Sequence, residues 1–447
     1  MTRQAEQGRA NETPAFHPVR ILEIELGGPL PDISAADAAT ARRYRRALAL
    51  VRLHTQTIGL AELDLGEQGL TAAELAAQLW QKLDAPINTH LHHDGLPPIA
   101  ALNATGLPPT HTPPCIQERE RFLAHAPLAS IIVATRDRAQ SLQASLDSLL
   151  TLKYPEFEII VVDNAPSTTA TADLVQTRYG QEPRIRYVRE DRPGLGNAHN
   201  RGLQEVRGEI VAFTDDDIVA DRYWLAELVK GFEAAENVGA VTGLVFTAEL
   251  ETPAQLWFEQ SAGWSSRQGK RVYDLNHNRP PSPFYPYSCG MIGTGANMAF
   301  RASVLREMGG FDAALGPGAP ALGGEDLAAY FEVLVRGYRI VYEPSAIVRH
   351  WHRRDYEALR KQAFAYGAGL TSHLTKVLLE KPWRVIDFAL RLPAGLVYAL
   401  RSDSALVTEP SALYPKELTT LTRQGLLHGP IGYLQGRYQF LKARKTK

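Results

Sequence analysis

The sequence predicts an α/β protein with a mainly parallel central sheet, preceded by a small α/β unit and followed by a helical extension. From residue 128 onward, unbroken apolar runs alternate with segments of helical periodicity, which is typical of parallel strands covered by helices on both faces. The composition, with 45% apolar and 22% charged residues in a chain of 447, is that of a globular protein with room for two or three domains.

The strands and helices of the main domain follow one another in regular order. Ligands of such sheets bind beyond the carboxyl ends of the strands, because loops and helix N-termini converge there. We therefore look for the chemistry in the residues that follow each strand. Strands are predicted at 130–134, 158–162, 185–188 and 210–213, and helices at 142–152 and 172–179.

Shifts in composition divide the rest of the chain. The polar N-terminus lacks the pattern of a signal peptide and predicts a disordered tail. Strand patterns at 20–26 and 48–53 with a helical run at 71–83 predict a small α/β unit, and the prolines crowded after it predict a semi-rigid linker without helix or central strand. The predicted parts are a tail 1–18, an α/β unit 19–95, a linker 96–126, a main domain 127–355 and a helical extension 356–447.

Charge and cysteine usage narrow the class of protein. A formal net charge of −1 gives the chain no general attraction for nucleic acid, so none is expected as a partner. Cys115 and Cys289 lie far apart, and neither has the spacing of a metal ligand or redox pair; we expect a reducing, cytoplasmic location. The apolar stretch 385–400 contains charged residues and a proline and falls short of the roughly 20 residues that span a bilayer.

A histidine cluster at the end of the small α/β unit has two interpretations. His90, His92, His93 and Asp94 could ligate a metal ion. The local order supplies no rigid ligand geometry, however, and we expect these residues to form the solvated polar end of a helix.

Charged residues follow all four strands of the main domain. The first strand leads to Thr135 and Arg136, the second to Asp163, and the fourth ends in Asp215, Asp216 and Asp217. Taken singly, such residues could be helix caps or turn residues. Three adjacent carboxylates repel one another unless they share a cation, and oxygen ligands suit Mg²⁺ or Mn²⁺. The triplet therefore predicts a divalent metal site, with Asp215 and Asp217 pointing the same way.

Four motifs in a fixed order resemble the inverting glycosyltransferases of family 2, which have the GT-A fold. The resemblance covers roughly residues 128–352. The motifs are SIIVATRDR at 130–138 with EIIVVDNAPS at 158–167, FTDDDI at 213–218, GTGANMAFR at 293–301 with GGEDL at 323–327, and His350 at the end of an apolar strand. One departure is the turn after the second strand, which reads Asp163, Asn164, Ala165, Pro166, where many relatives have a second aspartate and a glycine. This departure leaves the identity of the donor nucleotide open.

The resemblance implies a role for each matching residue. A nucleotide-sugar donor would be bound at its base and ribose by Thr135, Arg136 and Asp163, and at its ribose or a metal-bound water by Asp215. The metal ligands would be Asp217 and His350, with Asp215 as a supporting contact and His352 as a rival for the histidine position. The glycine loop around Gly293 and Gly295 would lie at the donor, and the acidic pair Glu325 and Asp326 would carry the catalytic base.

Two further inferences come from the residues themselves. Arg192, Asn197 and Arg201 follow the third strand in a glycine-rich segment and could contact the donor, although a helix-entry turn explains them equally well. Glu325 and Asp326 begin a helical pattern, where the helix dipole favours the ionised carboxylate that must accept a proton from the attacking hydroxyl. Asp326 is our choice for the base.

The sequence therefore predicts a transferase that moves a sugar from a nucleoside-diphosphate-sugar to an acceptor hydroxyl, with Mn²⁺ or Mg²⁺ and with inversion at the sugar. The acceptor is expected to be a glycan or a lipid-linked molecule. Basic residues around the apolar stretch after residue 380 could bring the protein to the inner face of a membrane, or the helix could pack on the main domain. The alternatives are a non-catalytic sugar- or nucleotide-binding protein on the same fold and a sugar-nucleotide pyrophosphorylase.

Overall fold

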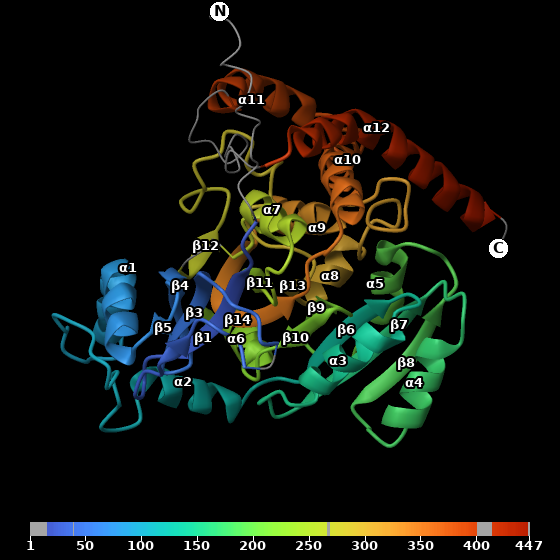
Figure 1. Ribbon diagram of the computed structural model, residues 1–447. Coiled ribbons are helices and arrows are strands. Elements are labelled where there is room, and N and C mark those ends of the chain that lie inside the picture. Colours follow the sequence, from blue (N-terminus) through green and yellow to red (C-terminus); the bar gives the residue numbers. More distant parts are fainter. Residues whose placement is uncertain (1–15, 39, 266–268, 400–413, 446–447) are drawn as a thin grey trace, which may run out of the picture.

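A large mixed sheet crosses the middle of the protein and carries helices on both faces (Figure 1). The computed structural model describes residues 16–38, 40–265, 269–399 and 414–445. Within this part of the chain the sheet has nine strands in the order β10-β14-β11-β13-β9-β6-β7-β8, and β12 pairs with β14. The predicted α/β fold class, with its separate N-terminal unit and C-terminal helices, is confirmed.

The first half of the sheet follows the prediction closely. Its four strands are all parallel, and every residue of β7 is buried, because helices cover both faces and leave no polar side to the strand. The strands are β6 (Ala129–Thr135), β7 (Phe157–Asn164), β8 (Ile185–Glu190) and β9 (Ile210–Asp215), and the helices are α3 (Ala139–Leu149), α4 (Ala170–Tyr179) and α5 (Leu195–Leu203).

The second half of the sheet contains reversals of direction. β13 (Asn297–Arg301) lies antiparallel between β9 and β11 (Val238–Thr247). β14 (Arg339–His350) is parallel to β11 and antiparallel to β10 (Ile218–Ala220) and β12 (Arg271–Tyr273). The helical elements of this half are α6 (Trp224–Lys230), the 3₁₀ turn η1 (Gly231–Glu233), α7 (Pro253–Ala262), α8 (Ala302–Met308) and α9 (Glu325–Val335).

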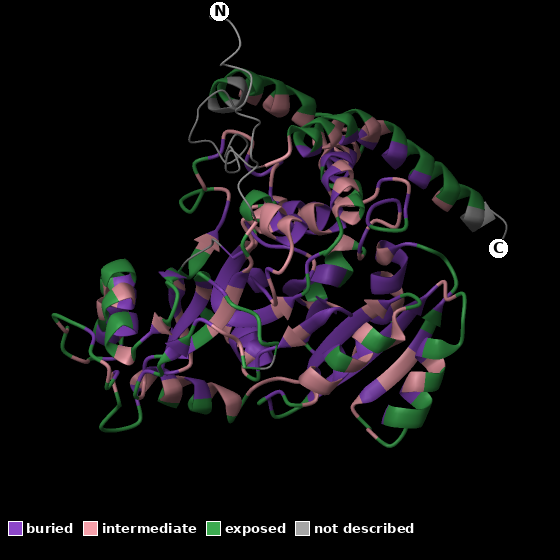
Figure 2. Ribbon diagram, viewed as in Figure 1, coloured by how far each residue is buried: buried purple, intermediate pink, exposed green. Residues whose placement is uncertain are grey.

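Two buried apolar clusters fill the space between the sheet and its helices (Figure 2). Alternate residues of β6 belong to different clusters: Ile131 and Val133 lie in one and Ile132 lies in the other. The second cluster encloses the imidazole of His199, whose ring lies 4.8 Å from that of Phe213 and 4.9 Å from that of Phe311. Desolvation lowers the pKa of His199 to about 3.

The burial of His199 predicts a loss of stability in acid. In the unfolded chain the imidazole titrates near pH 6.5. Between that pH and about pH 3, the unfolded chain therefore binds a proton that the folded chain does not bind. His199 should therefore lower the free energy of unfolding by about 1.4 kcal/mol per pH unit in this window, or roughly 2 kcal/mol between pH 6.5 and 5. Denaturant unfolding at a series of pH values measures this slope.

The variant His199→Leu tests the assignment. Its free energy of unfolding should depend less steeply on pH between 6.5 and 5 than that of the unmodified protein. A residual slope will remain, because His373 is also desolvated and has its pKa lowered to about 3. Equal slopes for the two proteins would contradict the assignment to His199.

The N-terminal unit is a three-stranded sheet with one long helix beside it. Its strands β1 (Val19–Glu25), β3 (Arg46–Leu53) and β4 (Gln56–Asp64) lie in the order β1-β3-β4. Helix α1 (Ala72–His93) begins at a capping box between Thr71 and Glu74, which satisfies free N–H groups of the first turn. It continues ten residues beyond the predicted end at 83, past a non-helical Leu83 and Pro86. The short strands β2 (Ile33–Ser34) and β5 (Gly69–Leu70) pair with each other.

The proline-rich stretch contains a helix that the sequence analysis excluded. Residues Pro114–Leu123 form α2, with Pro113 as N-cap. The prediction was wrong because Pro114 occupies the first helical position, where no backbone N–H is needed and the fixed φ of proline suits the helix. Six prolines indicated irregular structure, but the last of them begins a helix.

Three helices follow the sheet, namely α10 (Tyr356–Glu380), α11 (Arg384–Ala399) and α12 (Lys416–Lys445). α12 packs along α10 at a distance that requires glycine, because a Cβ on Gly367 would lie 2.0 Å from the carbonyl oxygen of Thr422. None of the described helices combines the length and apolar content needed to cross a bilayer. Most of the predicted tail, together with residues 400–413, lies outside the described residues.

Candidate active site

The aspartate triplet lies where β9 ends and turns into β10. Asp215 is the last residue of the strand, and Asp217 immediately precedes β10. Because β10 pairs antiparallel with the end of β14, Ile218 lies opposite His350. Nε2 of His350 is 3.3 Å from Oδ1 of Asp217 and 3.8 Å from Oδ2 of Asp215. The sheet thus brings together the three residues that the sequence analysis chose as metal ligands.

The two neighbouring histidines are distinguished by their contacts. Nε2 of His352 lies 2.8 Å from Oε2 of Glu259, whereas His350 faces Asp215 and Asp217. Asp215, Asp217 and His350 each offer one atom within 4.8 Å of the others. Two carboxylate oxygens and one imidazole nitrogen suit Mn²⁺ and are compatible with Mg²⁺, so these residues could hold a divalent cation.

Arg138 is part of this site, although the sequence analysis chose Arg136. The Arg138 guanidinium donates to Oδ1 of Asp216 at 2.7 Å and to Oδ2 of Asp217 at 2.6 Å. The side chain of Arg136 is 53% exposed, and its ion pair is with Asp137 at 3.8 Å. Asp137 has φ +53°, so the chain bends sharply between the two arginines, and strand alternation cannot indicate which of them faces the aspartates.

Asp216 is buried and has a supporting role. Its Oδ2 accepts a hydrogen bond of 2.6 Å from Thr135, and its Oδ1 accepts one from Arg138. The hydroxyl of Thr135, chosen in the sequence analysis for the donor, is therefore bonded to Asp216. This contact joins the end of β6 to the turn after β9.

Electrostatics separate the two aspartates that face His350. Burial alone would disfavour ionisation of Asp217, but the hydrogen bond to His350 and the charges of His350 and Arg138 hold its pKa well below the usual range. Desolvation and the negative charge of Asp217 raise the pKa of Asp215; its side chain is 40% exposed, so solvent screens part of this effect. Asp217 is thus the carboxylate that stays ionised over the whole physiological pH range.

Asp163 lies beside Thr135 in the sheet, because the two residues are register partners at the ends of β7 and β6. It is fully buried. The Tyr187 hydroxyl donates to its Oδ2 at 2.9 Å, and its Oδ1 has no hydrogen-bond partner among the described residues. Burial raises the pKa of Asp163. A buried acceptor without a partner is costly, and a donor N–H from a bound molecule would satisfy it.

The three residues predicted after the third strand have local partners. Arg192 donates to both carboxylate oxygens of Glu190, and Arg201 pairs with Glu205. The side-chain amide of Asn197 donates to the carbonyl oxygen of Pro193 at 2.9 Å. This geometry matches the helix-entry alternative, in which these residues shape the start of α5.

The glycines of the same segment allow two parts of the chain to approach each other. The backbone N–H of Leu195 donates to the carbonyl oxygen of Pro317, and a Cβ on Gly196 would lie 2.8 Å from the carbonyl oxygen of Asp312. The close approach is therefore made by the loop at 312–318, which leads toward α9, and the glycines position that loop.

Glu325 and Asp326 begin α9, as predicted. The backbone N–H of Gly295 donates to Oδ2 of Asp326 at 3.2 Å, and that of Leu327 donates to Oδ1 at 2.8 Å. These two bonds orient the carboxylate of Asp326. Gly293, in contrast, packs against β11, since a Cβ there would lie 2.5 Å from the side chain of Thr242.

Glu325 has a raised pKa. Burial, the charge of Asp326 and a smaller contribution from Asp215 raise the pKa of Glu325 to about 8, so this carboxyl is neutral below that pH. Its Oε2 is buried without a hydrogen-bond partner among the described residues. Nη1 of Arg353 lies 3.8 Å from Oδ2 of Asp217, and Arg353 lines the same cavity as Glu325 and Asp326, which links the acidic pair to the triplet.

A cavity of about 1820 Å³ opens beside the acidic pair. Gly293, Glu325, Asp326 and Arg353 lie on its wall, together with the aromatic rings of Trp264, Tyr273 and Tyr366. Other aromatic residues of the segment before the glycine loop belong to the interior, since Tyr285 and Tyr287 are buried. The cavity is large enough for several sugar rings, and aromatic faces suit such rings.

The fold and the site define an α/β protein with a candidate divalent-cation site at the strand ends and an acidic pair on the wall of a cavity. The model of the family described as Glycosyl transferase family 2 matches residues 130–308 of this chain. This match agrees with the resemblance to family 2 glycosyltransferases predicted from the sequence.

Characterised relatives and solved structures also resemble the chain. It is 26% identical over 242 residues to a pre-mycofactocin glycosyltransferase of Mycobacterium tuberculosis, covering 54% of this chain and 46% of the relative. It is 25% identical over 262 residues to a poly-β-1,6-N-acetyl-D-glucosamine synthase of Staphylococcus epidermidis, covering 58% and 57%. The chain thus spans about half the length of these relatives. A mannosyltransferase of Pyrobaculum calidifontis, solved with GDP-Man and Mn²⁺, has a TM-score of 0.45 at 21% identity, covering 71% and 93%.

Proposed function

We propose that this chain is a glycosyltransferase that moves a sugar from a nucleoside-diphosphate-sugar to an acceptor hydroxyl with inversion at the anomeric carbon. The observation that carries the proposal is the convergence of Asp215, Asp217 and His350 at the strand ends, beside the cavity that Glu325 and Asp326 line. The names of the two relatives are consistent with sugar transfer.

The donor would lie across the carboxyl ends of β6, β7 and β9. The free Oδ1 of Asp163 is suited to accept a hydrogen bond from the base or ribose. A divalent cation held by Asp217, Asp215 and His350 would stabilise the negative charge that develops on the leaving diphosphate. Arg138 adds a positive charge at the same place, since it contacts both Asp216 and Asp217.

The acceptor would enter through the cavity and present its hydroxyl to Asp326. Asp326 is held by two backbone N–H groups, so it is oriented and can take the proton as the hydroxyl attacks. Glu325, neutral below about pH 8, adds no second negative charge beside it. Direct attack by the acceptor, without a covalent sugar–enzyme bond, inverts the anomeric centre.

Two other functions remain as alternatives with their own tests. A non-catalytic sugar- or nucleotide-binding protein would bind its ligand without turnover and without need for a metal. A sugar-nucleotide pyrophosphorylase would need a glycine-rich first loop with activating basic residues, which the sequence after Ala134 lacks. The acidic pair beside the strand-end cluster favours the transferase.

The acceptor is proposed to be a glycan or a lipid-linked molecule, with peripheral contact to a membrane through α11. Its large apolar side chains Ile386, Leu390 and Val397 are 69%, 76% and 62% exposed. The other face packs on the main domain, where Phe388 contacts Tyr287 and Arg391 donates to the carbonyl oxygen of Tyr285. One face of the helix thus packs on the main domain, and the exposed apolar side chains of the other face support the proposed membrane contact.

Thermal unfolding with nucleoside diphosphates tests the donor proposal. In the presence of Mn²⁺, one base should raise the melting temperature, because a ligand at 100 times its dissociation constant stabilises the folded protein by about 2.7 kcal/mol. A chelator should remove the shift, and the matching nucleotide-sugar should be hydrolysed slowly. Sugar or nucleotide binding that is insensitive to chelator and without turnover would favour the non-catalytic alternative.

A further inference from the structure

A second cluster of metal-binding side chains lies in the N-terminal unit, away from the proposed catalytic site. It consists of His54, His90, Asp94 and Cys115, which each offer one ligand atom within 4.8 Å of the others. All but His90 are buried, and the side chain of His90 is only 12% exposed. We propose that these four residues bind a zinc ion that fastens helix α2 to the N-terminal unit.

Three separate elements supply the four side chains. His54 lies in the turn between β3 and β4 and has φ +55°, followed by Thr55 with φ +66°. His90 is on the last turn of α1, and Asp94 is the C-cap of that helix. Cys115 is on the first turn of α2. Left-handed backbone at two consecutive residues other than glycine is uncommon, and here it aims the imidazole of His54 at the other three groups.

The separations between the ligand atoms run from 2.8 to 4.0 Å and bracket those of a tetrahedral zinc site. Oδ2 of Asp94 lies 2.8 Å from Nδ1 of His54, 3.3 Å from Nε2 of His90 and 3.0 Å from Sγ of Cys115. Nε2 of His90 is 3.1 Å from Nδ1 of His54 and 4.0 Å from Sγ of Cys115. Zinc bonds of about 2.0 to 2.3 Å at tetrahedral angles separate neighbouring ligand atoms by roughly 3.3 to 3.6 Å.

The kinds of ligand also indicate the metal. Two imidazoles, one carboxylate and one thiol form a donor set that zinc accepts readily, whereas Mg²⁺ and Ca²⁺ require oxygen. The set has four members, which closes a tetrahedral site and leaves no open position for a substrate. A structural rather than a catalytic zinc is therefore proposed.

A network of hydrogen bonds alone explains the cluster less well. Three groups lie within 3.3 Å of one carboxylate oxygen of Asp94. If both imidazoles donate to it, their N–H groups crowd each other at 3.1 Å. If only one donates, the lone pair of the other nitrogen faces the carboxylate. A cation at the centre would let all four atoms present lone pairs to the same point.

The cluster revises the expectation for the histidine run at 90–94. His92 and His93 are exposed, in agreement with a solvated helix end. His90 and Asp94 are turned inward, because they lie four positions apart and therefore on the same face of the helical end. Their partners His54 and Cys115 come from other elements, and no local pattern of residues indicates that they meet the end of α1.

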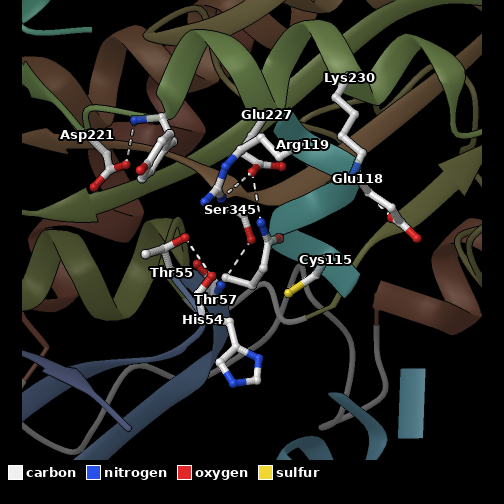
Figure 3. A network of polar contacts seen from close by, with 12 residues as sticks. His54, Thr55, Thr57, Cys115, Glu118, Arg119, Asp221, Glu227, Lys230 and Ser345 are labelled. Carbon is white, nitrogen blue, oxygen red and sulfur yellow. Dashed lines mark hydrogen bonds and ion pairs between the residues drawn. The ribbon is translucent and has the colours of Figure 1, made fainter. Parts of the chain in front are cut away.

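Two of the segments that carry ligands contact the main domain (Figure 3). They are the β3–β4 hairpin with His54 and helix α2 with Cys115. Beyond His54, the backbone N–H of Thr57 donates to the Ser345 hydroxyl, and the Thr57 hydroxyl donates to the carbonyl oxygen of Pro344. Beyond Cys115, Arg119 forms an ion pair of 3.0 Å with Glu227, and Gln56 donates to the same carboxylate. A zinc ion would join the β3–β4 hairpin to α2. Gln56 of the hairpin and Arg119 of α2 both contact the carboxylate of Glu227.

Metal analysis of the full-length protein, purified without chelator, tests the proposal. We expect about one zinc per chain after dialysis. Cobalt substituted for zinc should give the near-ultraviolet absorption of a cobalt–thiolate bond. Less than about 0.1 zinc per chain, together with no such absorption after cobalt is added, would overturn the proposal.

Variants separate this site from the catalytic one. Cys115→Ser should abolish the cobalt–thiolate absorption and lower the retained zinc at least tenfold. His92→Gln, which changes an exposed histidine close to the cluster, should leave both unchanged. Asp217→Asn, which alters the strand-end cluster, should also retain the zinc. Full zinc content in folded Cys115→Ser would overturn the assignment; if that variant fails to fold, the stoichiometry and cobalt spectrum of the unmodified protein still decide. Neither outcome depends on whether sugar transfer is found.

Discussion

Asp217→Asn should lower the rate of sugar transfer by about 10²- to 10⁴-fold, because cation stabilisation of the leaving diphosphate contributes several kcal/mol. Asp217 is the only one of the three described ligand candidates of this site that is both a carboxylate and largely buried, and its 3.3 Å contact with His350 fixes its direction. Initial rates measured against donor and Mn²⁺ concentration should show the loss together with a higher Mn²⁺ requirement.

The histidine pair provides a matched control for the metal site. His350→Gln should also raise the Mn²⁺ requirement, whereas His352→Gln should leave it near that of the unmodified protein, because His352 is engaged with Glu259. A melting curve for each variant excludes misfolding. An unchanged Mn²⁺ requirement in both Asp217→Asn and His350→Gln would refute the metal assignment.

Asp326→Asn should stop transfer while leaving donor binding intact, with a loss of about 10²- to 10⁴-fold as expected for a general base. The amide has one acceptor oxygen, so it can accept a hydrogen bond from the N–H of Gly295 or of Leu327 but not from both, and a melting curve must show that the variant keeps its fold. Donor binding is measured by the thermal shift with nucleoside diphosphate and Mn²⁺, and transfer is measured by product formation.

The neighbouring carboxyl distinguishes two possible bases. Glu325→Gln should cost less activity than Asp326→Asn, because Glu325 is already neutral below about pH 8 and glutamine resembles the neutral acid. In the unmodified protein, ionisation of Glu325 above that pH should change the rate by adding a negative charge beside Asp326, and this step should disappear in Glu325→Gln. A larger loss in Glu325→Gln than in Asp326→Asn would make Glu325 the base.

Several features of the fold were predictable because their causes are local. The buried strands β6, β7 and β9 appear in the sequence as unbroken apolar runs, since covering helices remove the need for a polar face. Asp163 and the aspartate triplet follow those strands directly, so their place at one edge of a parallel sheet comes from the topology alone. The acidic pair was predicted from its position after two glycines and before a helical pattern.

Contacts between distant residues decided the rest. The antiparallel course of β13 between β9 and β11 was not predictable, because strand pairing is not encoded in the period of a single strand. The left-handed backbone at Asp137 directs Arg138 rather than Arg136 to the aspartates. His352 contacts Glu259, which lies far from it in the sequence, and not the aspartates.

The sequence by itself determined the parallel half of the sheet and the carboxylates at its edge, because burial and chain order act on neighbouring residues. Only the tertiary structure decided which arginine and which histidine complete the strand-end site. It also decided that His54 and Cys115 meet the end of α1. The physical reason is that a ligand cluster depends on where separate elements pack, and the packing of His54, His90 and Cys115 is set by contacts that no local pattern records.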